Sequence, residues 1–229
     1  MVTLSSDPPL FPPMHPSETP ISQETALSYQ AELQLLRTQF KGDFLCNTLV
    51  LLWSKLNAKN PRLEEIKPVM EGMSNYYRYA LASLQEGTIP LSEEWEAVSG
   101  YLAVQKARFG DQLELDCKIS EQAMTFPIPR IFLQPLVDNA VTHGRRTSEP
   151  PAKIRIAASC PDKKTLSVEV ANTGLWDDEP SIIPRPPSVS LENLKRRLAL
   201  LYPGKKHRME ITDKDGWITV KIRLSQKVL

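Results

Sequence analysis

The spacing of apolar residues changes halfway along the chain, and this change limits the possible folds more than any other feature. Between Leu27 and Leu84 apolar residues recur every three or four positions, as one face of a helix requires. After Gly110 the spacing shortens, and segments such as residues 112–120 alternate apolar and polar side chains as a strand does. We therefore expect an α+β protein in which helices precede a sheet.

The first half predicts a helical hairpin. One pattern runs from the cap-like Ser22 to Asn60 and is interrupted only weakly at Gly42, and a second runs from Pro61 to Gly87. A hairpin of this kind cannot bury both of its apolar faces by itself. We therefore expect two copies to pair as a four-helix bundle, which makes the protein a homodimer.

A third helix and a sheet follow the hairpin. The helix is expected over residues 91–110, with Ser92 as its cap and Gly110 as its stop. The rest predicts an α/β sandwich, a mixed sheet covered on one face by helices. Its expected helices are 128–144 and 191–202, and its expected strands are 112–120, 153–159, 165–172, 207–213 and 216–224.

Two segments rich in proline fit neither helix nor central strand. Residues 1–22 predict a disordered tail, and residues of about 175–190 predict a lid, a binding loop or a disordered segment. The expected division is thus a tail (1–22), a dimerisation hairpin (23–88) and an α/β domain (89–229).

Composition excludes several classes of function. The 28 basic residues nearly balance the 27 acidic ones, so no overall field draws the chain to nucleic acid or to an anionic membrane. Cys46, Cys117 and Cys160 lack the spacing of a metal site or a disulfide framework, which predicts buried thiols in a reducing compartment. No apolar run is long enough to cross a bilayer, and no signal segment is present. We expect a cytoplasmic protein without nucleic-acid binding or membrane insertion.

The stretch LQPLVDNAVTHG, residues 133–144, carries the most informative polar side chains. On a helix, Asn139 and His143 lie one turn apart on the same face, next to Asp138. An amide oxygen and an imidazole suit a hydrated magnesium ion and nucleotide phosphates. Taken alone, the same residues also fit a helix surface or a capping role.

Several motifs resemble, in order, those of the LytS/YehU-type sensor histidine kinases, whose ATPase domain belongs to the GHKL superfamily with gyrase and Hsp90. LRTQFKGDFLCNTL is similar to the phospho-acceptor box LxxQxxPHFLFNxL, and MSNYYRYAL to LSxLLRYxL. IPRIFLQPLVDNAVTHG is similar to IPxLLLQPLVENAxxHG, and SVSLENLKRRLALLY to GxGLxNxxxRLxLLY. The resemblance covers nearly all of residues 33–224 and implies a hairpin dimerisation domain followed by a GHKL, or Bergerat, ATPase-like sandwich.

This resemblance implies roles for matching residues, and it implies ATP and magnesium as ligands. Asn139 would bind magnesium, Asp138 would replace the family's Glu as the polarising carboxylate, and His143 would approach the phosphates. The remaining nucleotide-binding positions implied by the motifs are Asn172 at the adenine amino group, Gly174 in the turn under the adenine, and Asn193 and Arg197 near the triphosphate.

The departures from the family pattern concern catalysis. Gly42 and Asp43 replace the family's Pro-His, and the chain's only histidines are His15, His143 and His207, so Asp43 stands at a degenerate phospho-acceptor position. An exposed Asp on a helix lacks the acidic metal pocket on which acyl phosphates depend. Autophosphorylation is therefore predicted to be lost.

Two further departures concern nucleotide binding. Ser188 and Ser190 replace the lid glycines, whose positive φ lets backbone amides approach phosphate, and Asn172 replaces an acidic residue. The serines predict weakened ATP binding, whereas an Asn carbonyl still accepts a hydrogen bond from adenine.

Three hypotheses remain open. The first is a two-component pseudokinase that acts as a scaffold for a response regulator, such as one with a LytTR domain, or for a partner histidine kinase. The alternative is an ATP-binding kinase or ATPase that phosphorylates a partner protein in trans. In the third, the ATPase fold survives only as a packing module and nucleotide plays no part.

Overall fold

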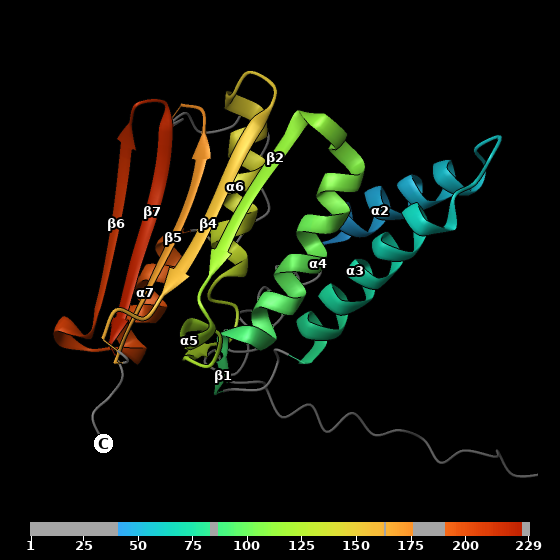
Figure 1. The fold of residues 1–229 in the computed structure, drawn as a ribbon. Coiled ribbons are helices and arrows are strands. Elements are labelled where there is room, and N and C mark those ends of the chain that lie inside the picture. The colour runs from blue at the N-terminus through green and yellow to red at the C-terminus, as the bar shows by residue number, and fades with distance from the viewer. Residues whose placement is uncertain (1–40, 83–86, 163, 176–190, 226–229) are drawn as a thin grey trace, which may run out of the picture. The chain divides into compact units, whose positions relative to one another are not determined.

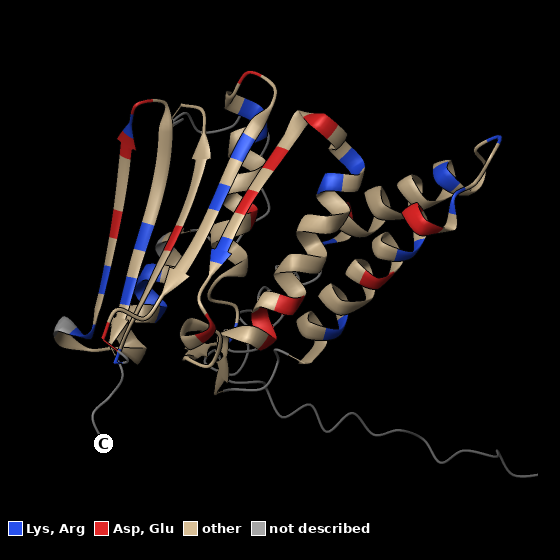
Figure 2. Ribbon diagram, in the orientation of Figure 1, with Lys and Arg blue, Asp and Glu red and all other residues tan. Residues whose placement is uncertain are grey.

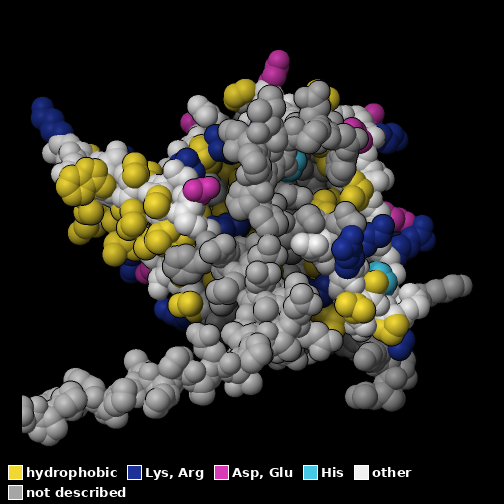
Figure 3. Space-filling view, turned by 180° about the vertical axis from the view of Figure 1, so that it is seen from behind, with side chains coloured by type: hydrophobic (Ala, Val, Ile, Leu, Met, Phe, Trp, Pro, Cys, Tyr) yellow, Lys and Arg dark blue, Asp and Glu magenta, His cyan; other side chains and the backbone are white. Residues whose placement is uncertain are grey.

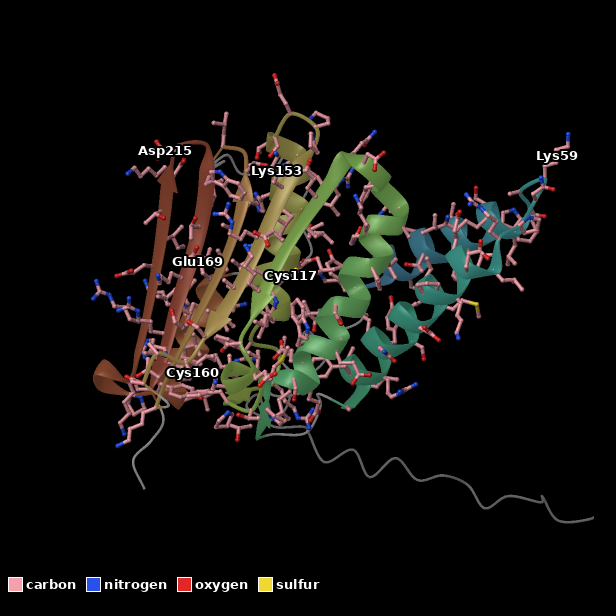
Figure 4. All side chains as sticks on the ribbon, in the orientation of Figure 1. Lys59, Cys117, Lys153, Cys160, Glu169 and Asp215 are labelled. Atoms are coloured by element: carbon pink, nitrogen blue, oxygen red, sulfur yellow. The ribbon has the colours of Figure 1, made fainter. Side chains whose placement is uncertain are left out.

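A helical hairpin opens the described part of the chain. The computed structural model of the protein describes residues 41–82, 87–162, 164–175 and 191–225, which all belong to one compact unit, residues 36–229. Helices α2 (Gly42–Leu56) and α3 (Leu63–Ala82) run antiparallel (Figure 1), and Lys59 lies at the tip between them (Figure 4). Lys55 of α2 pairs with Glu65 of α3, with 2.7 Å between Nζ and Oε2. The predicted hairpin is confirmed.

The first helix starts later than its apolar pattern suggested. Lys41 has φ −72° and ψ 87°, which is not helical, and α2 begins at Gly42. The prediction of one continuous helix from Ser22 to Asn60 is therefore wrong at this point, and its part before Lys41 lies outside the described residues. Glycine is a poor helix former, so an apolar pattern that passes through Gly42 does not ensure that the helix continues.

Helix α4 (Leu91–Phe109) is preceded by a proline and followed by a glycine. Pro90 takes the cap position and Ser92 lies inside the helix, so the prediction that Ser92 caps it is wrong. The reason is a short strand β1 (Thr88–Pro90), which pairs antiparallel with β3 (Pro127–Pro129) and holds the backbone extended up to Pro90. Gly110 ends the helix with φ +54°, as predicted.

Helices α3 and α4 approach each other at a pair of glycines. A Cβ atom on Gly72 would lie 2.5 Å from the carbonyl oxygen of Gly100, and one on Gly100 would lie 2.8 Å from that of Gly72. The two backbones are therefore in direct contact, which no other residue type permits.

A five-stranded mixed sheet forms the second half (Figure 1). Strand β2 pairs parallel with β4, and the other neighbours are antiparallel. Helices α6 (Gln134–Thr147) and α7 (Leu191–Leu201) cover one face, and the short helix α5 (Glu121–Met124) follows β2. The sheet order is β2 (Leu113–Ile119), β4 (Ala152–Ser159), β5 (Thr165–Thr173), β7 (Trp217–Ser225) and β6 (His207–Lys214). The predicted α+β class with helices on one face is confirmed.

The helix expected over residues 128–144 is shifted toward the C-terminus. Residues 127–129 form strand β3, and α6 starts only at Gln134. Pro127 and Pro129 favour extended backbone for themselves and for the residues before them, which explains the delay.

The open face of the sheet is charged but balanced. Figure 2 shows Lys and Arg beside Asp and Glu on neighbouring strands. Lys153 of β4 lies 3.3 Å from Glu114 of β2, and Lys221 of β7 lies 3.4 Å from Glu169 of β5. Figure 4 labels Cys117, Lys153 and Glu169 on three adjacent strands. Cys117 and Cys46 are exposed, so the prediction of buried thiols is wrong for both.

None of the helices in the described ranges is both long enough and apolar enough to span a lipid bilayer.

Candidate functional site

Helix α6 lies directly on the sheet because it carries a glycine where the contact is closest. A Cβ atom on Gly144 would lie 3.1 Å from both Asn172 Cβ and Ile154 Cδ1. This close approach places the polar side of α6 next to the end of β5. The residues that sequence analysis selected on α6 and β5 are thereby brought to one place.

A cavity lies between α6, β5, β7 and the start of α7. It contains about 450 Å³ of empty space, with open solvent at its mouth included. Its lining is mainly apolar and consists of Leu136, Asn139, Ala140, His143, Val170, Asn172, Leu191, Ile218 and Val220. An apolar slot with a few polar groups suits a flat heterocycle.

Three predicted residues supply the polar groups of this cavity. Asn139 and His143 come from α6, one turn apart, and Asn172 comes from β5. Asn172 is almost fully buried, and its Nδ2 donates to the Thr173 carbonyl at 2.8 Å. With its N–H group engaged there, the side chain keeps its amide oxygen as the acceptor for a ligand.

Gly174 forms a turn that only glycine tolerates. Its φ is +124°, and a Cβ atom there would lie 2.1 Å from Thr147 Oγ1. Its N–H donates to the Gly216 carbonyl at 3.1 Å, which ties the end of β5 to the turn before β7. Gly174 therefore shapes the edge of the site but does not line the cavity.

Asp138 faces away from the cavity. Its Oδ1 accepts a hydrogen bond of 2.9 Å from the Tyr101 hydroxyl and pairs with the ammonium group of Lys41. Lys41 directly precedes α2, and its own carbonyl accepts a hydrogen bond of 2.8 Å from Tyr77. The carboxylate predicted to polarise a reactant is thus engaged in joining α6 to α4 and to the start of α2.

The two predicted residues of α7 do not line the cavity. Asn193 is exposed in the first turn. Arg197 is half-buried, donates to the Ile131 carbonyl through Nη2, and has a buried Nε without a hydrogen-bond partner. Burial lowers the pKa of Arg197, and the Glu94 and Tyr79 groups counter that effect.

Asp43 lies on a different part of the molecule. It is exposed in the first turn of α2 and does not line the cavity. Ser188 and Ser190, together with nearly all of the proline-rich loop, lie outside the described residues. The roles implied for all these positions stay predictions.

Glu94 of α4 was missed by sequence analysis. It is fully buried, and its two carboxylate oxygens accept three backbone N–H groups at the start of α6, those of Phe132, Leu133 and Gln134, at 3.1, 2.9 and 2.9 Å. Burial raises its pKa, while these three donors and Arg197 act in the opposite direction. A signal existed, because Glu94 falls on the apolar face of its helix, where a charged residue requires partners.

Comparison with known proteins identifies the helical part. Residues 31–113 match the family model described as histidine kinase. The sensor protein kinase HptS of Staphylococcus aureus (strain USA300) is 32% identical over 144 residues, which is 63% of this chain and 26% of that protein. The chain thus spans about a quarter of the length of this curated relative.

Solved structures resemble the fold at low sequence identity. A bacterial phosphotransferase aligns with a TM-score of 0.51 at 13% identity, over 86% of this chain and 96% of that chain. The histidine kinase domain of the blue-light activated histidine kinase EL346 of Erythrobacter litoralis aligns with a TM-score of 0.45 at 15% identity, over 87% and 94%. Such likeness concerns the fold and not the activity.

The family match falls on the segment that carries the motifs LRTQFKGDFLCNTL and MSNYYRYAL. The match covers the hairpin and α4, and the motifs on α6 and α7 lie beyond it. The match and the relative support a relationship of the chain to the LytS/YehU-like sensor histidine kinases.

Proposed function

We propose that the chain is a two-component signalling protein that has lost autophosphorylation and regulates a partner by binding it. The observation that carries this proposal is Asp43, which is exposed on α2 where the resemblance places the reactive histidine. The partner is a response regulator, such as one with a LytTR domain, or a histidine kinase that keeps its acceptor. The hairpin around Asp43 is the docking surface in this proposal.

The purified protein is expected to take up no label when incubated with magnesium and ATP labelled at the γ-phosphate. A carboxylate on an exposed helix has no metal ion to screen a transferred phosphoryl group, so the acyl phosphate is not formed. Retained label is measured after electrophoresis. The Asp43→His variant is the matched control, since it restores the acceptor and leaves the cavity unchanged.

Label on the unchanged protein that hydroxylamine releases, and that Asp43→Ala lacks, would contradict the proposal. Label that appears on an added kinase or regulator only when this chain is present would instead support transfer in trans. That second function is favoured by one observation: Asn139 and His143 line the same cavity as Asn172.

Nucleotide binding is part of the proposal. The apolar walls would hold the adenine, Asn172 would accept its amino group, and Asn139 would bind magnesium near the phosphates. When bound, magnesium would neutralise phosphate charge. Ser188 and Ser190 reduce the affinity for ATP in this proposal, because serine adopts the positive φ of the family's lid glycines only with strain.

Magnesium and millimolar ATP are expected to raise the melting temperature of the protein. A ligand that binds only the folded state adds stability by mass action, about 2.7 kcal/mol at a hundred times its Kd, and a weak site gives less. The Asn139→Ala variant is expected to lose the shift, which scanning fluorimetry measures. Asn57→Ala is the matched control, because Asn57 caps α2 and does not line the cavity.

The absence of a shift in the unchanged protein at millimolar ATP would remove nucleotide from the proposal and leave the packing-module hypothesis. A shift of equal size in Asn139→Ala would show that binding occurs elsewhere.

An apolar stripe on the hairpin supports a homodimer. Figure 3 shows hydrophobic side chains gathered on the hairpin. We call these residues the hairpin stripe: Leu49, Val50, Trp53 and Leu56 of α2, and Leu63, Met70 and Leu81 of α3. Trp53 is 71% exposed in the single chain. A patch of this kind marks an interaction surface, and a second copy covers it as a four-helix bundle.

Trp53→Glu is expected to convert a dimer into a monomer. The substitution places a charge in the centre of the hairpin stripe, where pairing would remove it from water. Sedimentation equilibrium gives the mass of the full chain. Leu200→Glu is the matched control, because Leu200 is 82% exposed on α7 and lies off the stripe. The role of the stripe would be contradicted if the unchanged protein were a monomer at high micromolar concentration. It would also be contradicted if both variants lost the dimer equally.

A further inference from the structure

Ile131, just before α6, has a backbone conformation that isoleucine rarely adopts. Its φ is +55°, and its side chain is buried. A β-branched residue in the left-handed region is strained by about 1–3 kcal/mol, and such strain persists only where the surroundings over-determine the backbone. The groups that hold Ile131 in place therefore have structural consequences.

Side chains from two distant helices hold both backbone polar groups of Ile131. Its N–H donates to the Tyr79 hydroxyl oxygen at 2.9 Å, and its carbonyl accepts from Arg197 Nη2. Tyr79 belongs to α3 of the hairpin, and Arg197 belongs to α7. We call Tyr79, Glu94 and Arg197 the Ile131 clamp, because Glu94 accepts the next three N–H groups of the same turn.

The three members of the clamp depend on one another. Tyr79 lies close enough to Glu94 that burial, together with the Glu94 charge, raises the pKa of Tyr79. Arg197 and Glu94 also lie close enough for each charge to affect the pKa of the other. Because Tyr79 and Glu94 are buried, a broken contact leaves polar groups without water to replace the partner. The network is therefore expected to form or break as a unit.

Helix α7 connects this clamp to the cavity. Leu191, the first residue of α7, lines the cavity, and Arg197 lies six residues further along the same helix, which is about 9 Å at the rise of an α-helix. A displacement of α7 at its cavity end therefore changes the hydrogen bond from Arg197 to the Ile131 carbonyl. The same strained residue is held from the other side by the hairpin.

We propose that the Ile131 clamp couples helix α7 to helix α3, with Tyr79, Glu94 and Arg197 as positioning residues. A change at the cavity then alters the local stability of the hairpin, and a change at the hairpin alters the cavity. The idea that this coupling transmits nucleotide binding to a docked partner rests on the proposed function. The coupling itself does not rest on it.

Hydrogen exchange of backbone amides in the full chain, without nucleotide, tests the coupling. In Tyr79→Phe the exchange rate of α7 amides is expected to rise about tenfold. Tyr79 makes no hydrogen bond to the described residues of α7; it meets Arg197 through Ile131 and through its effect on the pKa of Arg197. Amides of β5 are the internal reference, since a general loss of stability would raise exchange there as well. Tyr76→Phe is the matched control, because Tyr76 lies on the same helix and its hydroxyl accepts a hydrogen bond of 2.6 Å from the Gln134 side chain and not from Ile131.

The reverse direction is tested with Arg197→Lys, which keeps the charge but not the planar pair of donors. Here the exchange of α3 amides near Tyr79 is expected to rise, again about tenfold relative to β5. Unchanged exchange in the distant helix in both variants would overturn the proposal, as would an equal rise in Tyr76→Phe. Since no nucleotide is present, a failure of nucleotide binding leaves this test unaffected.

Discussion

Glu94→Ala is expected to lower the free energy of unfolding by about 3–5 kcal/mol, the cost of removing one partner from a buried charged network. The substitution leaves the N–H groups of Phe132, Leu133 and Gln134 without this acceptor, and it removes the negative charge that counters the effect of burial on Arg197. For a chain of this length such a loss lowers the melting temperature by roughly 10 °C. Urea unfolding followed by circular dichroism measures the free energy.

The adjacent residue provides the control for this prediction. Glu93 is on the same turn of α4 but is 44% exposed, and its Oε1 pairs with Arg130 Nη1 at 3.0 Å. Exposed pairs contribute about 0–1 kcal/mol, so Glu93→Ala is expected to have a small effect. A loss below about 1 kcal/mol in Glu94→Ala would show that the start of α6 does not depend on this carboxylate.

Gly72→Ala is expected to destabilise the protein by about 1–3 kcal/mol, the usual cost of overpacking. Alanine is the better helix former by about 1 kcal/mol, so without a clash the substitution would stabilise α3. The new Cβ atom, however, would lie 2.5 Å from the Gly100 carbonyl oxygen. Because that oxygen belongs to the backbone of α4, no side-chain rotation relieves the contact and the helices must separate. Thermal unfolding measures the loss.

Gly42→Ala is the matched control, since it makes the same change in a helix where the new Cβ atom has no neighbour within 4 Å. It is expected to leave the melting temperature unchanged or to raise it slightly. If both substitutions stabilise the protein, the close approach of α3 and α4 at Gly72 and Gly100 is not the tight contact described above.

Part of the candidate site was predictable because its residues lie close together in sequence. Asn139 and His143 are one helical turn apart, so a correct helix prediction was enough to place them on one face. The alternation of residues 165–172 predicted strand β5, which carries Asn172. The role of Asp43 as a degenerate acceptor stays a prediction from the motif alone.

Other predicted residues do not line the cavity, because their partners come from distant parts of the chain. Asp138 is next to Asn139, yet its carboxylate contacts Tyr101, 37 residues earlier, and Lys41. It therefore does not line the cavity. Arg197 bonds to Ile131, 66 residues earlier. Local periodicity contains no information about contacts at such separations, since packing selects them only when the helices and the sheet come together.

The sequence by itself determined the α+β class, the hairpin and the strands of the sheet, because each depends on short-range periodicity. Only the tertiary structure decided that Glu94 holds the start of α6, that Gly72 and Gly100 let two helices touch, and that Ile131 is strained. The physical reason is burial: a buried charge, a backbone contact and a strained φ are stable only when residues far apart in the chain surround them.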